Sequence, residues 1–312
     1  MKHEGWRTSL VAMTSIYIIL FSLPAYGQAV SIDKAVAIAL SNHPAARSKS
    51  TIAQQAERAL MLDELARQVK AAYMEVVYCG QRLDIMRQHA AYFDTLIDVA
   101  EIRLTSDSIN QLPMVSAGSI YAAYQSRMYA AQEELNRATI RLCLLLYITG
   151  GKIETEDTEL NLYQIHHDKT DRFDAVKHKA LYDAKLTEAK KTAELEKNRL
   201  FSRRARIIQA ETDAKQKIYE IEYRKFADTL NVEALKSLLN QHYVQISFYR
   251  ENLLVEANLI LENIENDFAT GRITDYTDAF TRLTNAVSAK LNHLEYVYLY
   301  NQTALELEYL TQ

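Results

Sequence analysis

Residues 62–104 read LDELARQVKAAYMEVVYCGQRLDIMRQHAAYFDTLIDVAEIRL, and the fold follows from this stretch. Its apolar side chains recur at alternating steps of three and four residues: Leu62, Leu65, Val69, Ala72, Val76, Cys79, Leu83, Met86, Ala90, Phe93, Ile97, Ala100 and Leu104. Such a heptad pattern predicts a helix that packs along its whole length against a partner helix. At about 1.5 Å per residue, the helix would be roughly 60 Å long.

The partner helix follows directly in the sequence. The same alternation of apolar positions runs through Met114, Ala117, Tyr121, Tyr124, Met128, Ala131, Leu135, Ala138, Leu142 and Leu145. The polar connection from Thr105 to Leu112 is too short for anything but an antiparallel return. The sequence therefore predicts a long helical hairpin with its turn near Asp107. These apolar seams form the scaffold and carry no chemistry by themselves.

Composition supports an all-α fold for the whole chain. The 312 residues include only seven Gly and three Pro, and neither occurs between Gly151 and Gly271. Hairpin turns and barrel corners depend on those residues, so a β-sheet in this span is not expected. The formal net charge is −4, without a basic stripe, which argues against a nucleic-acid partner.

The N-terminus has the features of a signal peptide. Lys2 and Arg7 precede an apolar run from Leu10 to Leu23, and Ala25-Tyr26-Gly27 matches a cleavage site with small residues. We expect residues 1–27 to be removed after export. The alternative is an uncleaved anchor, although the apolar run is short for a membrane span of about 20 residues.

The rest of the chain divides into two similar halves. Residues 28–148 form the first helical-hairpin repeat, residues 149–172 a linker, and residues 173–312 the second repeat. Within the linker, residues 160–165 alternate weakly between apolar and polar side chains, which fits either a short strand or an extended strap. Because the second half repeats the plan of the first, the sequence indicates a weak tandem duplication.

The second half resumes the heptad pattern over residues 235–268. Its apolar positions are Leu239, Tyr243, Ile246, Leu253, Ala257, Ile260 and Ile264, and Arg250 interrupts the series. A polar turn at residues 270–275 follows, and then a final helix. This turn matches the one near Asp107 in position, since each lies between two long helices.

Three short motifs resemble TolC-like outer-membrane efflux proteins. The opening from Ser31 to Pro44 is similar to the start of that family, and residues 268–275 resemble its turn with an aromatic residue, a glycine and Ser or Thr. Residues 204–210 are similar to the heavy-metal branch, whose members serve resistance-nodulation-division (RND) pumps. Together with the signal peptide and the duplicated hairpins, these motifs cover nearly all of the mature chain.

The resemblance implies a homo-oligomeric exit duct in the cell outer membrane or periplasm. Three copies would form a helical tube, a periplasmic adaptor protein would dock on the hairpin tips, and an inner-membrane RND-type pump would supply the substrate. The tip residues implied in this sequence are Ser106, Asp107, Ser108, Ile109, Thr270, Gly271, Arg272 and Ile273.

The sequence departs from the family where strand pairs for a twelve-stranded barrel should interrupt each half. Near residues 54–62 and 198–204 we find no alternating segments of the length a membrane strand needs, and the helical pattern continues. The expected fold is therefore a TolC-like helical subunit with little or no barrel. The alternative function is a periplasmic coiled-coil scaffold without transport activity.

Few residues qualify as a chemical site. Asp275 and Asp278 follow the second tip turn, where they could ring a duct entrance and favour cations, or simply cap the helix that begins there. We find no nucleophile–base arrangement, no glycine-rich phosphate loop and no HExxH motif. The sequence therefore predicts no catalytic residues, no bound metal and no cofactor, and a protein that is not an enzyme.

Overall fold

The computed structural model describes residues 29–44, 52–105, 111–149, 153–163, 176–197, 204–270, 272–273 and 275–311. The predicted signal peptide, 1–27, and much of the predicted linker lie outside these residues. In the described part of the chain the protein is helical and has no β-strand. Among the described residues, the one β-type pairing is an isolated parallel bridge between Val30 and Thr155.

The helices confirm the all-α prediction. They are α2 (Ile32–Asn42), α3 (Ile52–Thr105), α4 (Gln111–Leu145), α6 (Val176–Lys197), α7 (Arg204–Phe248), the π-helix η2 (Tyr249–Leu253), α8 (Leu254–Ala269) and α9 (Tyr276–Thr311). Helix α3 contains the whole heptad stretch and runs unbroken through residues 54–62, as the sequence predicts. The second expected strand position, residues 198–204, lies outside the described residues except for Arg204, which begins α7.

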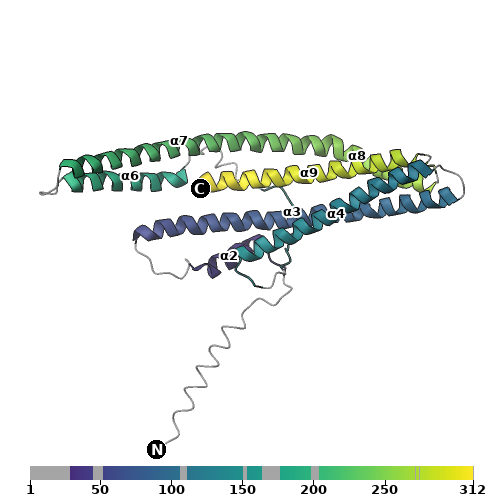
Figure 1. Ribbon diagram of the computed structural model, residues 1–312, viewed down its shortest axis with the longest axis horizontal. Coiled ribbons are helices and arrows are strands. Elements are labelled where there is room, and N and C mark those ends of the chain that lie inside the picture. Colours follow the sequence, from purple (N-terminus) through teal and green to yellow (C-terminus); the bar gives the residue numbers. More distant parts are fainter. Residues whose placement is uncertain are drawn as a thin grey trace, which may run out of the picture.

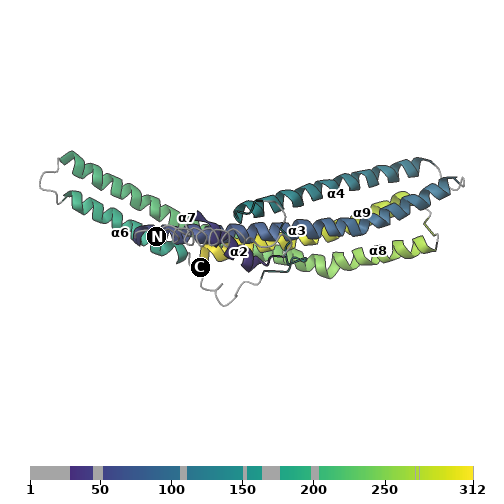
Figure 2. The same cartoon turned by 90° about the horizontal axis from the view of Figure 1, so that it is seen from below.

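Two long antiparallel pairs run side by side as an elongated bundle (Figure 1). The chain runs along α3 and returns along α4. It then runs along α7 and α8 and returns along α9. The ends of α3 and α8 lie at the same end of the bundle, so both hairpins turn there (Figures 1 and 2). Helix α6 packs against the first part of α7, and this pair points toward the opposite end.

Aromatic and aliphatic side chains from the heptad seams fill the core near the turn end. The ring of Phe93 on α3 is fully buried, 4.4 Å from the ring of Tyr124 on α4 and 5.6 Å from that of Phe280 on α9. The Tyr124 hydroxyl donates a hydrogen bond to the carbonyl of Met86 at 2.7 Å. One core therefore joins the two hairpins, because α3 contacts both α4 and α9.

Residues 153–163 form an extended strap rather than a strand. Asn301 on α9 is 1% exposed, and its side chain accepts a hydrogen bond from the backbone N–H of Tyr163 and donates one to the carbonyl of Asn161, both at 2.8 Å. The side chain of Gln81 on α3 accepts from the N–H of Leu160 at 2.9 Å. The strap is therefore bonded to the first hairpin and to α9.

The helix predicted across residues 235–268 is not continuous. At Arg250, where the apolar seam is interrupted, the chain forms the five-residue π-helix Tyr249–Leu253. A π-helical turn accommodates an extra residue and changes which face the following residues present. Ile246 before this turn and Ala257 after it are both buried, so the seam is recovered on the far side.

Candidate functional site

The connection between the end of α8 and the start of α9 is the predicted tip of the second hairpin. Helix α8 ends at Ala269, after which the Thr270 N–H donates to the carbonyl of Asn266 at 3.0 Å and the Arg272 N–H donates to that of Asp267 at 2.8 Å. These bonds satisfy carbonyl groups that would otherwise be unpaired at a helix end.

The predicted tip residues divide into three groups. Thr270 and Arg272 are exposed. Ile273 is 8% exposed and belongs to the core cluster that also contains Tyr276 and Phe280, so it anchors the start of α9. Ser106, Asp107, Ser108, Ile109 and Gly271 lie outside the described residues.

Asp275 and Asp278 both engage the start of α9. The Asp275 carboxylate accepts a hydrogen bond from the backbone N–H of Asp278 at 3.1 Å, which is the geometry of a helix N-cap. The Asp278 carboxylate pairs with the Arg282 guanidinium at 2.8 Å. The capping role that the sequence left open is therefore present in the single chain.

A cavity of about 250 Å³ lies against this turn, and its charged lining is mixed. Carboxylates come from Asp267, Asp275 and Asp278, and guanidinium groups come from Arg272 and Arg282. Because both signs are present, the surface suits a partner with polar groups of both signs. In the described part of the chain, no group of three or more His, Cys, Asp or Glu residues could hold a metal ion.

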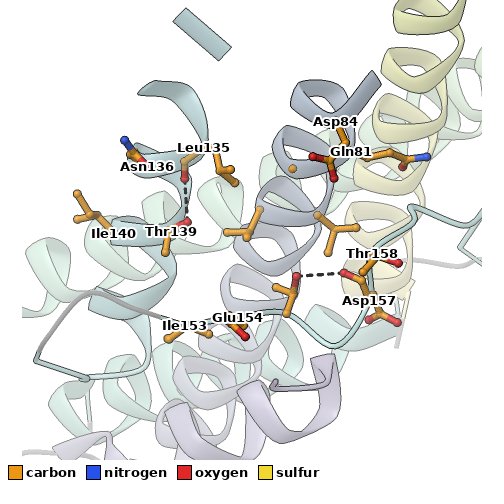
Figure 3. Close-up of a pocket in the computed structure, with 14 residues that line it drawn as sticks. Gln81, Asp84, Leu135, Asn136, Thr139, Ile140, Ile153, Glu154, Asp157 and Thr158 are labelled. Carbon is orange, nitrogen blue, oxygen red and sulfur yellow. Dashed lines mark hydrogen bonds between the residues drawn. The ribbon is translucent and has the colours of Figure 1, made fainter. Parts of the chain in front are cut away.

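A larger groove, of about 720 Å³, lies between α3, α4 and the strap (Figure 3). Asp84 and Gln81 line it from α3, and Asn136 and Thr139 line it from α4. The strap contributes Glu154, Thr155, Asp157 and Thr158. Its charged lining residues are all carboxylates: Asp84, Glu154 and Asp157. Sequence reasoning missed this groove, since its walls meet only when the strap folds back over α3.

Tyr73 on α3 holds the strap beside this groove. The Tyr73 hydroxyl beside it donates to the Asp157 carboxylate at 2.8 Å, and burial together with this bond raises the pKa of Tyr73 to about 12. At neutral pH this tyrosine is therefore a protonated donor that holds the strap.

Large apolar side chains are exposed along two opposite edges of the bundle. Helix α4 and helix α8 lie on either side of α3 and α9 (Figure 2). The α4 edge carries Val115, Tyr129, Ile140 and Leu144, which are 54–71% exposed, and the α7–α8 edge carries Val244, Phe248, Val255 and Leu259, which are 51–62% exposed. Such extended apolar edges are typical of protein–protein interfaces.

None of the described helices is long and apolar enough to cross a lipid bilayer. No protein-family model matches the sequence, and no curated protein matches it.

Solved outer-membrane channels share this fold. CusC aligns with a TM-score of 0.68 at 15% identity, over 89% of this chain and 74% of its own. The outer-membrane channel OprN aligns with a TM-score of 0.70 at 14% identity, over 90% of this chain and 71% of its own. The Campylobacter jejuni CmeC outer membrane channel aligns with a TM-score of 0.66 at 9% identity, over 83% of this chain and 64% of its own. The fold is thus that of TolC-like channels, as the sequence resemblance predicts.

Proposed function

We propose that this protein is a subunit of an efflux duct, exported to the outer membrane or periplasm. The observation that carries the proposal is the shared fold, which extends over about nine-tenths of the chain for channels such as OprN. In this proposal residues 1–27 are a cleaved signal peptide. The two hairpin repeats, 28–148 and 173–312, supply the duct wall, and residues 149–172 connect them.

The exposed edges support assembly of several copies. The α4 edge and the α7–α8 edge carry different residues, so one edge of a copy would pack against the other edge of the next. Head-to-tail contacts of this kind close into a ring when the rotation between copies allows it. We propose a trimer, the number that the family resemblance implies.

The tips are the proposed docking site for a periplasmic adaptor that links the duct to an inner-membrane RND-type pump. Thr270 and Arg272 are exposed at the end of the bundle where both hairpins turn, and Ile273 holds their loop from below. The sequence pairs this turn with Ser106–Ile109 of the first repeat. A docking partner would then contact two turns in each copy.

Cell fractionation combined with mass analysis tests this function. The tagged full chain is expressed, membranes and periplasm are separated, and the purified assembly is weighed by native mass spectrometry. A trimer in the outer-membrane fraction is the expected result. Recovery as a monomer or dimer in the periplasmic fraction would overturn the duct proposal.

A helical periplasmic scaffold without transport activity is the second candidate. The unbroken course of α3 through residues 54–62, where a strand pair was expected from the family, favours it. The two functions are separated by an efflux assay in which the gene is deleted and then restored. A duct subunit restores export of the pump's substrate, whereas a scaffold leaves export unchanged.

A further inference from the structure

The groove between α3, α4 and the strap combines an apolar lining with exposed carboxylates (Figure 3). Its volume of about 720 Å³ is within the range of sites that hold a ligand or several side chains of a partner. The apolar part of the lining consists of Val76, Val77, Leu135, Ile140 and Ile153. The groove therefore offers apolar contact and charge in one place.

The charged lining of the groove is entirely acidic among the described residues. Asp84 comes from α3, and Glu154 and Asp157 come from the strap, and all three are exposed. The strap, residues 153–163, contains four carboxylates and no Lys or Arg. Arg87 reaches the Asp84 carboxylate only at 3.8 Å, and both side chains are more than half exposed, so this pair neutralises little of the charge. The groove is therefore a region of negative potential.

The carboxylates are spread along the groove instead of converging on one point. Figure 3 shows Asp84 well apart from Glu154 and Asp157. Over the described residues, His, Cys, Asp and Glu side chains form no group of three or more that could hold a metal ion. Separated negative charges are complementary to a ligand with several separated positive charges, and they suit a single cation poorly.

Gly80 on α3 also lines the groove and indicates that another group approaches the helix there. Glycine weakens a helix interior, and it is favoured where a ligand or a second chain must come close to the backbone. A Cβ atom on Gly80 would meet no heavy atom of the described chain within 4 Å, leaving aside its chain neighbours and the backbone of its own helix. Packing within the described chain therefore does not account for this glycine.

A second copy of the chain is a poor match for the groove. Ile140 belongs both to the groove and to the α4 edge, so the surface of a second copy that would meet it is the α7–α8 edge. Over residues 232–259, this edge carries three carboxylates and two cationic side chains: Glu233, Glu251, Glu256, Lys236 and Arg250. Such a surface would bring like charges together at the groove. The charge therefore favours a different, basic chain.

We propose that the groove docks a segment of a partner protein that carries several Lys or Arg side chains and an apolar anchor. The cationic groups of the segment pair with Asp84, Glu154 and Asp157. Its apolar atoms, including the aliphatic stems of Lys or Arg, cover Gly80 and contact the apolar lining. The groove includes none of the tip residues, and this inference does not rest on the proposed duct.

Binding of a model peptide to the purified full chain provides the test. The probe is a short fluorescein-labelled peptide of leucine and lysine that forms an amphipathic helix, and its counterpart has glutamate in place of each lysine. Fluorescence anisotropy measures the affinity of both peptides. We expect the lysine peptide to bind the wild type saturably and the glutamate peptide to bind at least about tenfold more weakly, because like charges would meet in the groove.

Two glycine variants locate the bound peptide. Gly80→Phe should fill the groove and weaken binding of the lysine peptide by about tenfold or more. Gly118→Phe is the matched control, because this helix glycine on α4 has equally open surroundings but does not line the groove. Its affinity for the peptide should equal that of the wild type. Circular dichroism checks that both variants keep their helix content.

A second set of variants changes charge without changing shape. Asp84→Asn combined with Glu154→Gln should weaken binding of the lysine peptide by about tenfold, because two charge-assisted contacts are lost. Asp98→Asn combined with Glu101→Gln, two exposed positions of α3 outside the groove, should leave the affinity unchanged. Equal affinity of the groove variants and the wild type, or of the two peptides, would overturn the proposal. So would failure of the lysine peptide to bind the assembled wild type, the result expected if a second copy covers the groove.

Discussion

Phe280 ties the tip of the second hairpin to the core of the first. Its side chain is fully buried and lies near Phe93 on α3. We expect Phe280→Ala to lower the free energy of unfolding by about 3–5 kcal/mol, because the change removes buried apolar surface and leaves a cavity. Urea denaturation followed by circular dichroism measures this loss. The control is Phe226→Ala on α7, where the side chain is 62% exposed and the expected change is within about 0.5 kcal/mol.

Asp275 allows the two interpretations of the acidic tip to be separated. Its carboxylate caps α9, so Asp275→Ala should lower the free energy of unfolding by about 0.5–2 kcal/mol, whereas Asp275→Asn should keep most of the cap. Both variants are measured by urea denaturation. If the carboxylate also attracts cations at a duct entrance, Asp275→Asn should weaken cation preference in a conductance assay while stability is kept. Equal stability of Asp275→Ala and the wild type would contradict the capping role.

At the scale of elements, the two apolar edges are the features that a lone copy leaves uncovered. Tyr129 on the α4 edge is 71% exposed, and Phe248 on the α7–α8 edge is 51% exposed. We expect either Tyr129→Asp or Phe248→Asp to shift the assembly to monomers, because each places a charge in an apolar contact. Native mass spectrometry measures the shift. Leu195→Asp on α6 is the control, since its exposed side chain lies on neither edge, and an assembly that survives both edge variants would rule these edges out as the interface.

The stability of the whole molecule should depend on pH through three histidines. Burial lowers the pKa of His89, His242 and His293 below the ordinary value of 6.5. Just below pH 6.5 the unfolded chain therefore binds more protons than the folded chain, and the free energy of unfolding falls as the pH drops. The stabilising contribution of the three neutral histidines is complete above pH 6.5. It is lost as the pH falls through their lowered pKa values.

Urea denaturation at a series of pH values between about 7.5 and 5 measures this dependence. Replacing His89, His242 and His293 together by Gln should flatten it, even if the variant is less stable at every pH. The lowered pKa of Glu64 also reduces stability in acid, but only below its ordinary value of 4.5, outside this window. If the triple variant keeps the same dependence of the unfolding free energy on pH, groups other than these histidines cause it.

The sequence by itself determined the helices and their pairing. The unbroken three–four alternation from Leu62 to Leu104 specifies a long helix with one apolar face, and the short polar connection after it requires an antiparallel return. The scarcity of Gly and Pro excludes frequent turns. Ser31 likewise marks the start of α2, where its hydroxyl accepts from the Lys34 N–H. These features are local, so periodicity and capping chemistry suffice to predict them.

Only the tertiary structure decided where polar groups meet across the bundle. Asn301 looks like an ordinary interruption of the α9 seam until the strap places two backbone groups against it. Ile273 looks like an exposed tip residue in the sequence, but its side chain is buried in the core that α9 shares with the first hairpin. The partners in each case are far apart in sequence, and periodicity specifies which face is buried but not which groups on other elements will lie opposite it.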